Sequence, residues 1–224
     1  NLTTAGTDSL TSIDASAATG AVSVTTGNLD IGSTDVAITG GSGADTVDAG
    51  AHAGSDVSIS GGAGNDVITI NAGSDTVSGG DGTDVLAIGT ALNALDTVSG
   101  IETLRATAAV AQDFDDISGG STITRVEDGV GGNTAISFTD VSANVATLAL
   151  GTTANTNTVT VDRKADTSAD SLTVVSRGVD QTTLTVNDEE TLTIDSSVAA
   201  TTITTMNAAC LLYTSDAADE HRRG

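Results

Sequence analysis

The chain has almost no aromatic side chains and few basic residues. Aromatic residues make up 1% of the sequence, and 7 Lys and Arg stand against 30 Asp and Glu. Aromatic side chains dominate the energetics of most cores because each buries a large area, so we expect no ordinary globular core. The formal net charge of −23 argues against nucleic acid or an anionic membrane as partner, because either would repel the chain. This charge favours cations as partners.

The single cysteine and the single tyrosine both lie in a C-terminal segment whose composition breaks from everything before it. Cys210 to Glu220 read CLLYTSDAADE, which resembles the conceptual translation of a transposase sequencing adapter. We therefore predict that residues 210–224 are an artefact. Without them the chain has no cysteine, which excludes a disulfide framework and a thiolate metal site and is compatible with export.

The chain also lacks an initiator Met, a signal peptide and an apolar run long enough to cross a membrane. We therefore expect an internal fragment of a longer protein. Its secretion signal would lie outside the fragment, and the fragment itself would have no transmembrane segment.

Motifs of common enzyme classes are missing. The sequence has no H-E-x-x-H, no nucleophile with a histidine base, and no G-x-x-x-x-G-K-[ST]. Outside residues 210–224 the only histidine is His52, which we interpret as a solvated loop residue, so paired carboxylates would be the only catalytic chemistry left. A cation would hold stacked aspartates ionised, which suits a general acid poorly. We expect no active site in this segment.

A nine-residue repeat is the strongest feature that is present. From Gly61 to Ala87 the chain reads GGAGNDVIT, INAGSDTVS and GGDGTDVLA, which places Asp66, Asp75 and Asp84 nine residues apart. Glycines allow the backbone to turn with positive φ, the Asp supplies a carboxylate, and the residues after it form a short strand. The pattern predicts stacked turns that present oxygen ligands to an ion.

Two further units lie upstream at a looser spacing. GGSGADTVD contains Asp45, AHAGSDVSI contains Asp56, and GSTDV around Asp35 is a weaker echo. These units resemble those of the repeats-in-toxin (RTX) family, in which each coil of a β-roll takes two units, so that alternate aspartates share an edge. The resemblance implies one edge with Asp45, Asp66 and Asp84, a second edge with Asp56 and Asp75, and about three ion sites between them.

The nonapeptide G-G-x-G-x-D-x-U-x resembles that of the RTX family. This resemblance implies an all-β, parallel β-roll or right-handed β-solenoid that holds Ca²⁺ between successive turns. It implies metal ligands among the turn glycines, one asparagine and the repeat aspartates: Gly41, Gly43, Asp45, Gly54, Asp56, Gly62, Gly64, Asn65, Asp66, Gly73, Asp75, Gly80, Gly82 and Asp84.

Two rival interpretations of this pattern remain open. Gly, Asn, Asp and Ser dominate tight turns that bind nothing, although turn chemistry does not require a carboxylate at one phase of five units. Low aromatic content and high charge also suit disorder, but 38% hydrophobic residues in alternating runs do not. Repulsion between stacked aspartates favours disorder before calcium arrives, so binding energy would become folding energy.

After Ala87 short Thr-rich strands replace the repeat. Their alternation predicts a core face formed by Val159, Val161, Leu184, Val186, Leu192 and Ile194. The strands fit either further solenoid coils, which we favour, or a small β-sandwich. The likeness of GIETLRA, which begins at Gly100, to DEETLTI, which begins at Asp188, predicts one degenerate unit used twice.

Phrases such as DTVSGIETL (96–104) and SADSLTVV (168–175) are similar to segments that flank RTX repeats in surface-layer (S-layer) proteins of Gram-negative bacteria. The resemblance, which large RTX adhesins share, implies an extracellular or cell-surface protein exported by a type I system. It also implies possible self-association in a surface array. The alternative is a calcium-folded secretion appendage of an exoenzyme or toxin whose catalytic domain lies outside this fragment.

An acidic segment in the second half allows two interpretations. Asp113, Asp115 and Asp116 stand before a Gly pair, which fits either a further calcium site or a solvated turn, and we favour the turn. Phe114 and Phe138 are the only aromatics outside residues 210–224, and we interpret them as core plugs.

The expected organisation is strands leading into the roll (1–39), the RTX calcium-binding roll (40–89), a Thr-rich β-strand region (90–209) and the adapter segment (210–224).

Overall fold

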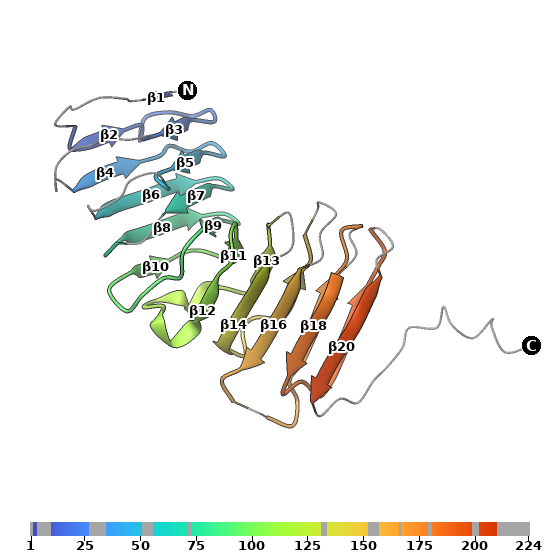
Figure 1. Cartoon of the computed structure of the whole chain (residues 1–224). Coiled ribbons are helices and arrows are strands. Elements are labelled where there is room, and N and C mark those ends of the chain that lie inside the picture. Colours follow the sequence, from blue (N-terminus) through green and yellow to red (C-terminus); the bar gives the residue numbers. More distant parts are fainter. Residues whose placement is uncertain are drawn as a thin grey trace, which may run out of the picture.

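The computed structural model describes residues 2–3, 10–26, 35–50, 56–70, 73–130, 134–151, 157–165, 167–178, 181–198 and 202–209. Within these ranges the chain forms an all-β solenoid of about 8 turns (Figure 1). Each coil contributes one strand to each of two faces, so neighbouring strands within a face run parallel.

The odd-numbered strands form one continuous ten-stranded face. They are β1 (Leu2–Thr3), β3 (Ser23–Thr25), β5 (Thr46–Asp48), β7 (Val67–Ile70), β9 (Val85–Ile88), β11 (Thr103–Ala106), β13 (Arg125–Asp128), β15 (Thr147–Ala149), β17 (Ser171–Val175) and β19 (Thr191–Asp195). Because this sheet runs unbroken from the repeat into the Thr-rich region, the second half continues the solenoid. The β-sandwich alternative is wrong.

The even-numbered strands form two five-stranded sheets on the opposite face. The first contains β2 (Ser12–Asp14), β4 (Val36–Thr39), β6 (Val57–Ala63), β8 (Thr76–Asp81) and β10 (Thr97–Ser99). The second contains β12 (Ala111–Asp113), β14 (Ala135–Val141), β16 (Thr158–Arg163), β18 (Gln181–Asn187) and β20 (Ile203–Ala209). In Figure 1 the strands of the second sheet run at a steep angle to those of the first.

Two short 3-10 helices, η1 (Phe114–Asp116) and η2 (Gly120–Thr122), lie where the even-numbered face is divided. Phe114 and Phe138 meet there edge to face, with ring centroids 6.5 Å apart. Both rings are buried, which confirms that they are core plugs. At this junction Ser118, not a strand of the second sheet, continues the ladder beyond β10 through a single bridge to Thr97.

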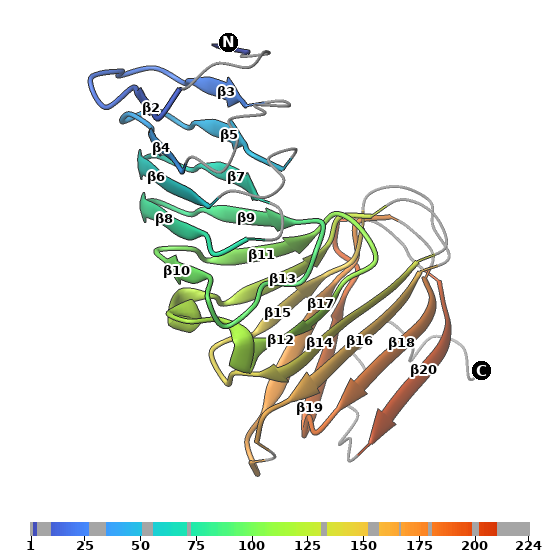
Figure 2. The ribbon, with the colours of Figure 1, turned by 60° about the vertical axis from the view of Figure 1, so that its left-hand side comes forward.

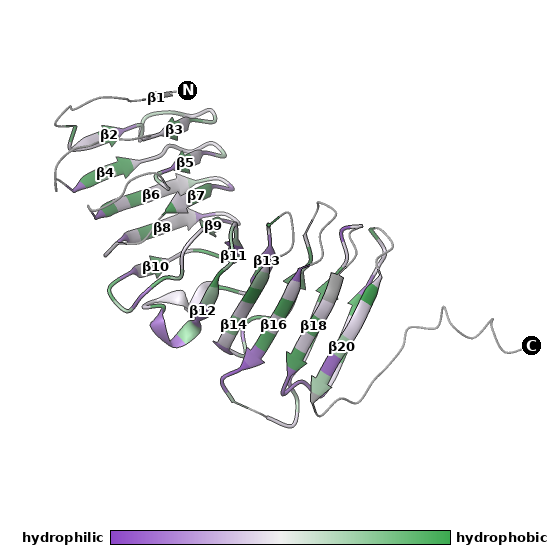
Figure 3. Cartoon of the chain, viewed as in Figure 1, coloured by the Kyte–Doolittle hydropathy of each residue, from purple (hydrophilic) through white to green (hydrophobic). Residues whose placement is uncertain are grey.

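The core is a column of Val, Ile and Leu side chains between the two faces, visible as green bands along the strands in Figure 3. The strands alternate buried and exposed residues because successive side chains point to opposite sides of a strand. Of the six side chains predicted to face the core, five are fully buried and Ile194 packs partly buried against them. Small aliphatic side chains suffice because each coil is covered by its neighbours.

Candidate calcium sites

A column of carboxylates runs along the edge where the even-numbered strands turn into the odd-numbered ones. Asp45, Asp66, Asp84 and Glu102 each directly precede an odd-numbered strand, from β5 to β11. The main-chain N–H of Asp45 donates to the carboxylate of Asp66 over 2.7 Å, and that of Asp66 donates to Asp84 over 2.7 Å. The N–H of Asp84 donates to Glu102 over 2.8 Å. The structure thus brings the three aspartates of the first predicted edge together, one per coil.

Two carboxylate oxygens in this column have no hydrogen-bond donor. Asp66 and Asp84 are 1% and 0% exposed, and among the described residues no group donates to the Oδ2 atom of either. Asp45 differs because its Oδ2 accepts a 2.7 Å hydrogen bond from the N–H of Gly41. A buried carboxylate oxygen without a donor is costly, so the turns at Asp66 and Asp84 fit a cation.

The glycines of these turns stack from coil to coil. Gly62 and Gly80 have φ of +105° and +111°, which L side chains rarely adopt. A Cβ at Gly80 would run into the carbonyl oxygen of Gly62, and a Cβ at Gly82 into that of Gly64. Gly41 and Gly43 present their carbonyl oxygens to the next coil in the same way. Only glycine therefore allows these backbone oxygens to approach the neighbouring turn.

Asp56, Asp75 and Asp96 directly precede even-numbered strands and form the second edge. Asp75 accepts from the N–H of Val57 over 2.9 Å and donates its own N–H to Asp96 over 2.8 Å. Asp56 is exposed, and its carboxylate accepts from the N–H of Ser74. Asp35 holds the same position before β4 but is also exposed.

An amide side chain closes part of the second edge. Asn93 Nδ2 donates to the carbonyl oxygen of Gly73 and to Asp96 Oδ2, over 2.8 and 3.0 Å. The carbonyl oxygen of Gly73 and the Oδ2 atom of Asp96 thus already accept hydrogen bonds from the same side chain. On the first edge Asn65 is exposed, and its side chain caps the N–H of Thr83. Gly54 and His52 lie outside the described residues.

Burial and mutual repulsion make these carboxylates hard to ionise without a counter-ion. Desolvation, with neighbouring acidic side chains, raises the pKa of Asp66 and of Asp84. The same causes raise the pKa of Asp75 to about 6. No lysine or arginine precedes Arg105 in the sequence, so the repeat coils contain neither of these cations to compensate.

The repeat pattern missed Asp96 and Glu102, which extend the two columns. Asp96 had a signal, since DTVSG occurs both at 75–79 and at 96–100. Glu102 had a signal as well, because it holds the same place in GIETLRA as Glu190 holds in DEETLTI. Glu190 Oε2 accepts from the N–H of Asp170 as Glu102 Oε2 accepts from that of Asp84. The two echoed segments therefore make the same contact, as one unit used twice.

The acidic turn near η1 is only partly assembled as predicted. Carboxylate oxygens of Asp113, Asp115 and Asp140 lie within 4.8 Å of one another, whereas Asp116 is not part of this group. Lys164 Nζ forms an ion pair with Asp115. A side-chain cation therefore already lies beside these carboxylates.

The geometry defines a class of protein, a parallel β-solenoid whose stacked glycine turns hold buried carboxylate oxygens that have no donor among the described residues. Residues 33–54 and 54–86 match the RTX calcium-binding nonapeptide repeat, in four copies. The chain thus carries an RTX calcium-binding β-roll, and repeats of this family bind Ca²⁺. No curated protein and no solved structure shows significant similarity to the chain.

RTX repeats of this kind indicate a calcium-binding structural segment, and proteins that carry them are typically secreted. Among the described residues no helix combines the length and the apolar character that crossing a membrane requires.

Proposed function

We propose that Ca²⁺ binds between stacked turns of the repeat coils and that the chain is a calcium-folded structural segment of a secreted bacterial cell-surface protein. The observation that carries the proposal is the pair of buried, donor-free oxygens on Asp66 and Asp84. They lie in a column of carboxylates that no lysine or arginine of the repeat coils neutralises.

The proposed ligands of the first edge are the side chains of Asp45, Asp66 and Asp84 together with carbonyl oxygens of their glycine turns. These turn glycines are Gly41, Gly43, Gly62, Gly64, Gly80 and Gly82. Carboxylate and carbonyl oxygens at a flexible site suit Ca²⁺ better than Mg²⁺, which demands near-ideal octahedral geometry. On the second edge Asp56 and Asp75, with the turns of Gly54 and Gly73, are the proposed ligands. Asn65 is proposed as a turn cap.

Calcium binding would make folding depend on the compartment. Extracellular modules commonly bind calcium at about 10⁻⁴ to 10⁻³ M, well above cytosolic levels. The repeat coils would then remain unfolded before export and fold outside the cell, because binding energy becomes folding energy.

A lattice or adhesive role is favoured over a secretion appendage by the extent of the solenoid. Beyond the matched repeats the same ten-stranded sheet continues through β11 to β19, which extends the solenoid well past the calcium-binding coils. The flanking phrases similar to those of S-layer proteins support the same conclusion. A catalytic motif upstream in the parent gene would favour the appendage instead, and further Thr-rich strands there would favour the surface role.

The test is a calcium titration of the full chain followed by circular dichroism. The wild type should gain β signal cooperatively near millimolar calcium. A variant with Asp66→Asn and Asp84→Asn should respond only at higher calcium. Asp96→Asn is the matched control, because both oxygens of Asp96 already accept hydrogen bonds from the protein. Equal strand content in chelator and in calcium would reject the proposal.

A further inference from the structure

Positive charge is concentrated at one place in this acidic chain. Outside residues 210–224 there are only five basic residues, Arg105, Arg125, Arg163, Lys164 and Arg177. Arg163 is buried, and Lys164 pairs with Asp115. The other three arginines converge on a single carboxylate, that of Glu127, and we call these four residues the arginine cluster.

The arginine cluster lies on the outer surface of the ten-stranded face, across β11, β13, β15 and β17, which stand side by side in Figure 2. Arg105 is in register with Glu127 on the next strand, and Arg125 lies two residues before it. Arg177, which follows β17, reaches Glu127 from two strands away. The small side chain of Ala149, in register with Glu127 on the strand between, leaves room for this crossing.

The cluster has donor capacity that Glu127 does not use. Arg105 and Arg125 each donate to it through Nε, over 2.6 and 2.8 Å, and Arg177 donates through Nη2. Among the described residues the remaining guanidinium nitrogens of all three have no hydrogen-bond partner. Their side chains are 31%, 30% and 22% exposed, whereas that of Glu127 is 4% exposed. Three guanidiniums and one carboxylate leave a formal charge of +2 facing solvent.

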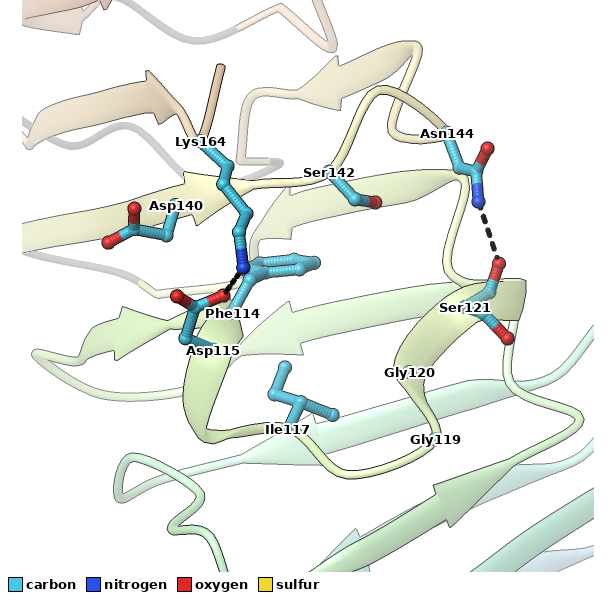
Figure 4. A pocket seen from close by; sticks show the side chains of 10 residues that line it. All are labelled: Phe114, Asp115, Ile117, Gly119, Gly120, Ser121, Asp140, Ser142, Asn144 and Lys164. Atoms are coloured by element: carbon cyan, nitrogen blue, oxygen red, sulfur yellow. Dashed lines mark hydrogen bonds and ion pairs between the residues drawn. The ribbon is translucent and has the colours of Figure 1, made fainter.

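A complementary surface lies elsewhere on the same molecule. Asp113, Asp115, Asp140 and Lys164 together carry a formal charge of −2, and we call them the acidic cluster. A cavity of about 310 Å³ opens beside it, lined also by Ser142 and Phe114 (Figure 4). Ser142 Oγ is buried without a hydrogen-bond partner among the described residues. The cavity thus offers carboxylates to a guanidinium, while the Ser142 hydroxyl lies beneath its surface.

The two clusters cannot meet within one molecule. The arginines meet at Glu127, near the carboxyl end of β13, although Arg125 itself begins that strand, whereas the acidic cluster lies at the carboxyl ends of even-numbered strands. In a two-faced solenoid these ends are on opposite edges, and the packed coils between them keep the edges apart.

We propose that the arginine cluster of one copy binds the acidic cluster of a second copy. The proposal rests on the surface role proposed above and identifies the contact through which copies associate. Because the two surfaces differ, the contact is head to tail, and a bound pair still presents one free cluster of each sign, one on each copy. Such contacts propagate into rings or open arrays. Charge complementarity fixes the register and speeds encounter more than it adds affinity, so we expect a weak contact.

The test uses two variants of the full chain in saturating calcium, followed by sedimentation velocity over a range of protein concentrations. Arg125→Gln with Arg177→Gln leaves Arg105 to pair with Glu127 and removes the +2 charge. Asp115→Asn with Asp140→Asn removes the −2 charge, and Asn tolerates the positive φ of Asp140. Asp14→Asn with Asp195→Asn is the control matched in net charge to the Asp115 and Asp140 variant, since both side chains cap local turns.

The wild type and the control should associate into open-ended species, and about 1 M salt should disperse them because the Debye length falls to about 3 Å. Each cluster variant should bind itself at least about tenfold more weakly. An equimolar mixture of the two variants should stop at a dimer, since it retains one working contact. A monomeric wild type, or variants that assemble like it, would overturn the proposal. The calcium response in circular dichroism is read in parallel, so its loss would reject the proposed function separately.

Discussion

The repeat coils and the later coils stack acidic residues along the same edge but differ in what neutralises them. From β5 to β9 the column of Asp45, Asp66 and Asp84 has no lysine or arginine in its coils, and among the described residues two of its buried oxygens have no donor. From β16 to β19 the same edge carries Asp170, Glu189 and Glu190. Glu189 Oε2 also has no donor among the described residues, but there a guanidinium pairs with the other oxygen of the same carboxylate.

Arg163 provides that guanidinium and is 6% exposed. It donates to Glu189 over 2.5 Å, to the carbonyl oxygen of Ser142 in the preceding coil and to that of Ser171 in its own. Hydrogen bonds from Thr167, with the nearby Arg163, lower the pKa of Asp170. Burial raises the pKa of Glu189 despite its pairing with Arg163. One side chain thus links three coils, as an ion would.

The difference teaches how one scaffold can fold conditionally or unconditionally. A column neutralised by Ca²⁺ depends on the surrounding calcium concentration, because the ion is absent from the unfolded chain. A column neutralised by arginine carries its cation in the sequence. We therefore expect the later coils to fold without calcium and the repeat coils to fold only with it.

The largest expected effect is that of removing the internal cation. Arg163→Met leaves Glu189 buried without its partner, which should lower the free energy of unfolding of the later coils by about 3–5 kcal/mol. Urea unfolding followed by circular dichroism should show the same loss in calcium and in chelator. Lys164→Met, the adjacent exposed residue, should have little effect. A loss seen only in calcium would contradict the assignment.

Removing one proposed ligand should act only when calcium is present. Asp84→Asn keeps the cap on the N–H of Asp66 but loses the charge, so it should remove a site that contributes about 2.7 kcal/mol at calcium one hundredfold above its Kd. In chelator the variant should be as stable as the wild type or more so, because a buried charge is gone. Asp96→Asn should show no such calcium dependence. Thermal melts in calcium and in chelator measure this difference. Equal losses of stability in the two conditions would contradict the assignment of Asp84 as a calcium ligand.

A methyl group among the stacked turn glycines should destabilise the repeat coils somewhat less than the loss of the Asp84 ligand does. Gly80→Ala places a side chain at φ +111° and against the carbonyl of Gly62, at a cost of about 1–3 kcal/mol. Gly89→Ala is the matched control, since a Cβ there meets only Thr107 Oγ1 at 3.6 Å. The midpoint of the calcium titration should move to higher calcium for Gly80→Ala alone. Identical midpoints would mean that the turns do not stack as described.

The smallest expected effect is a pH dependence in the later coils. Burial opposes ionisation of Glu127, but the guanidiniums of Arg105, Arg125 and Arg177 outweigh it and lower its pKa below 4.5. Its contribution is therefore complete above pH 4.5 and is lost as the pH falls through the pKa of the folded state. Urea midpoints measured in chelator should fall with pH over that range, and less steeply for Glu127→Gln. Equal slopes would contradict this prediction.

Sequence reasoning found the repeat coils because their period is regular. Two nine-residue units make one coil and return an Asp to the same edge, so the spacing, with the stacking that the RTX resemblance implied, predicted which aspartates share an edge. It missed Asp96 because Ala91, Leu92 and Ala94 replace the glycines before it. The later coils have no fixed period. Arg163 and Glu189 are 26 residues apart, and Arg177 lies 50 residues from Glu127, so only the fold brings these pairs together.

The most direct test of this account is hydrogen–deuterium exchange of the full chain in saturating calcium and in chelator. Amides of β4 to β9 should be protected in calcium and exchange freely in chelator, whereas amides of β15 to β19 should stay protected in both. Protection of the repeat strands in chelator would show that their carboxylate column needs no ion. Loss of protection in both regions together would show that arginine does not replace calcium in the later coils.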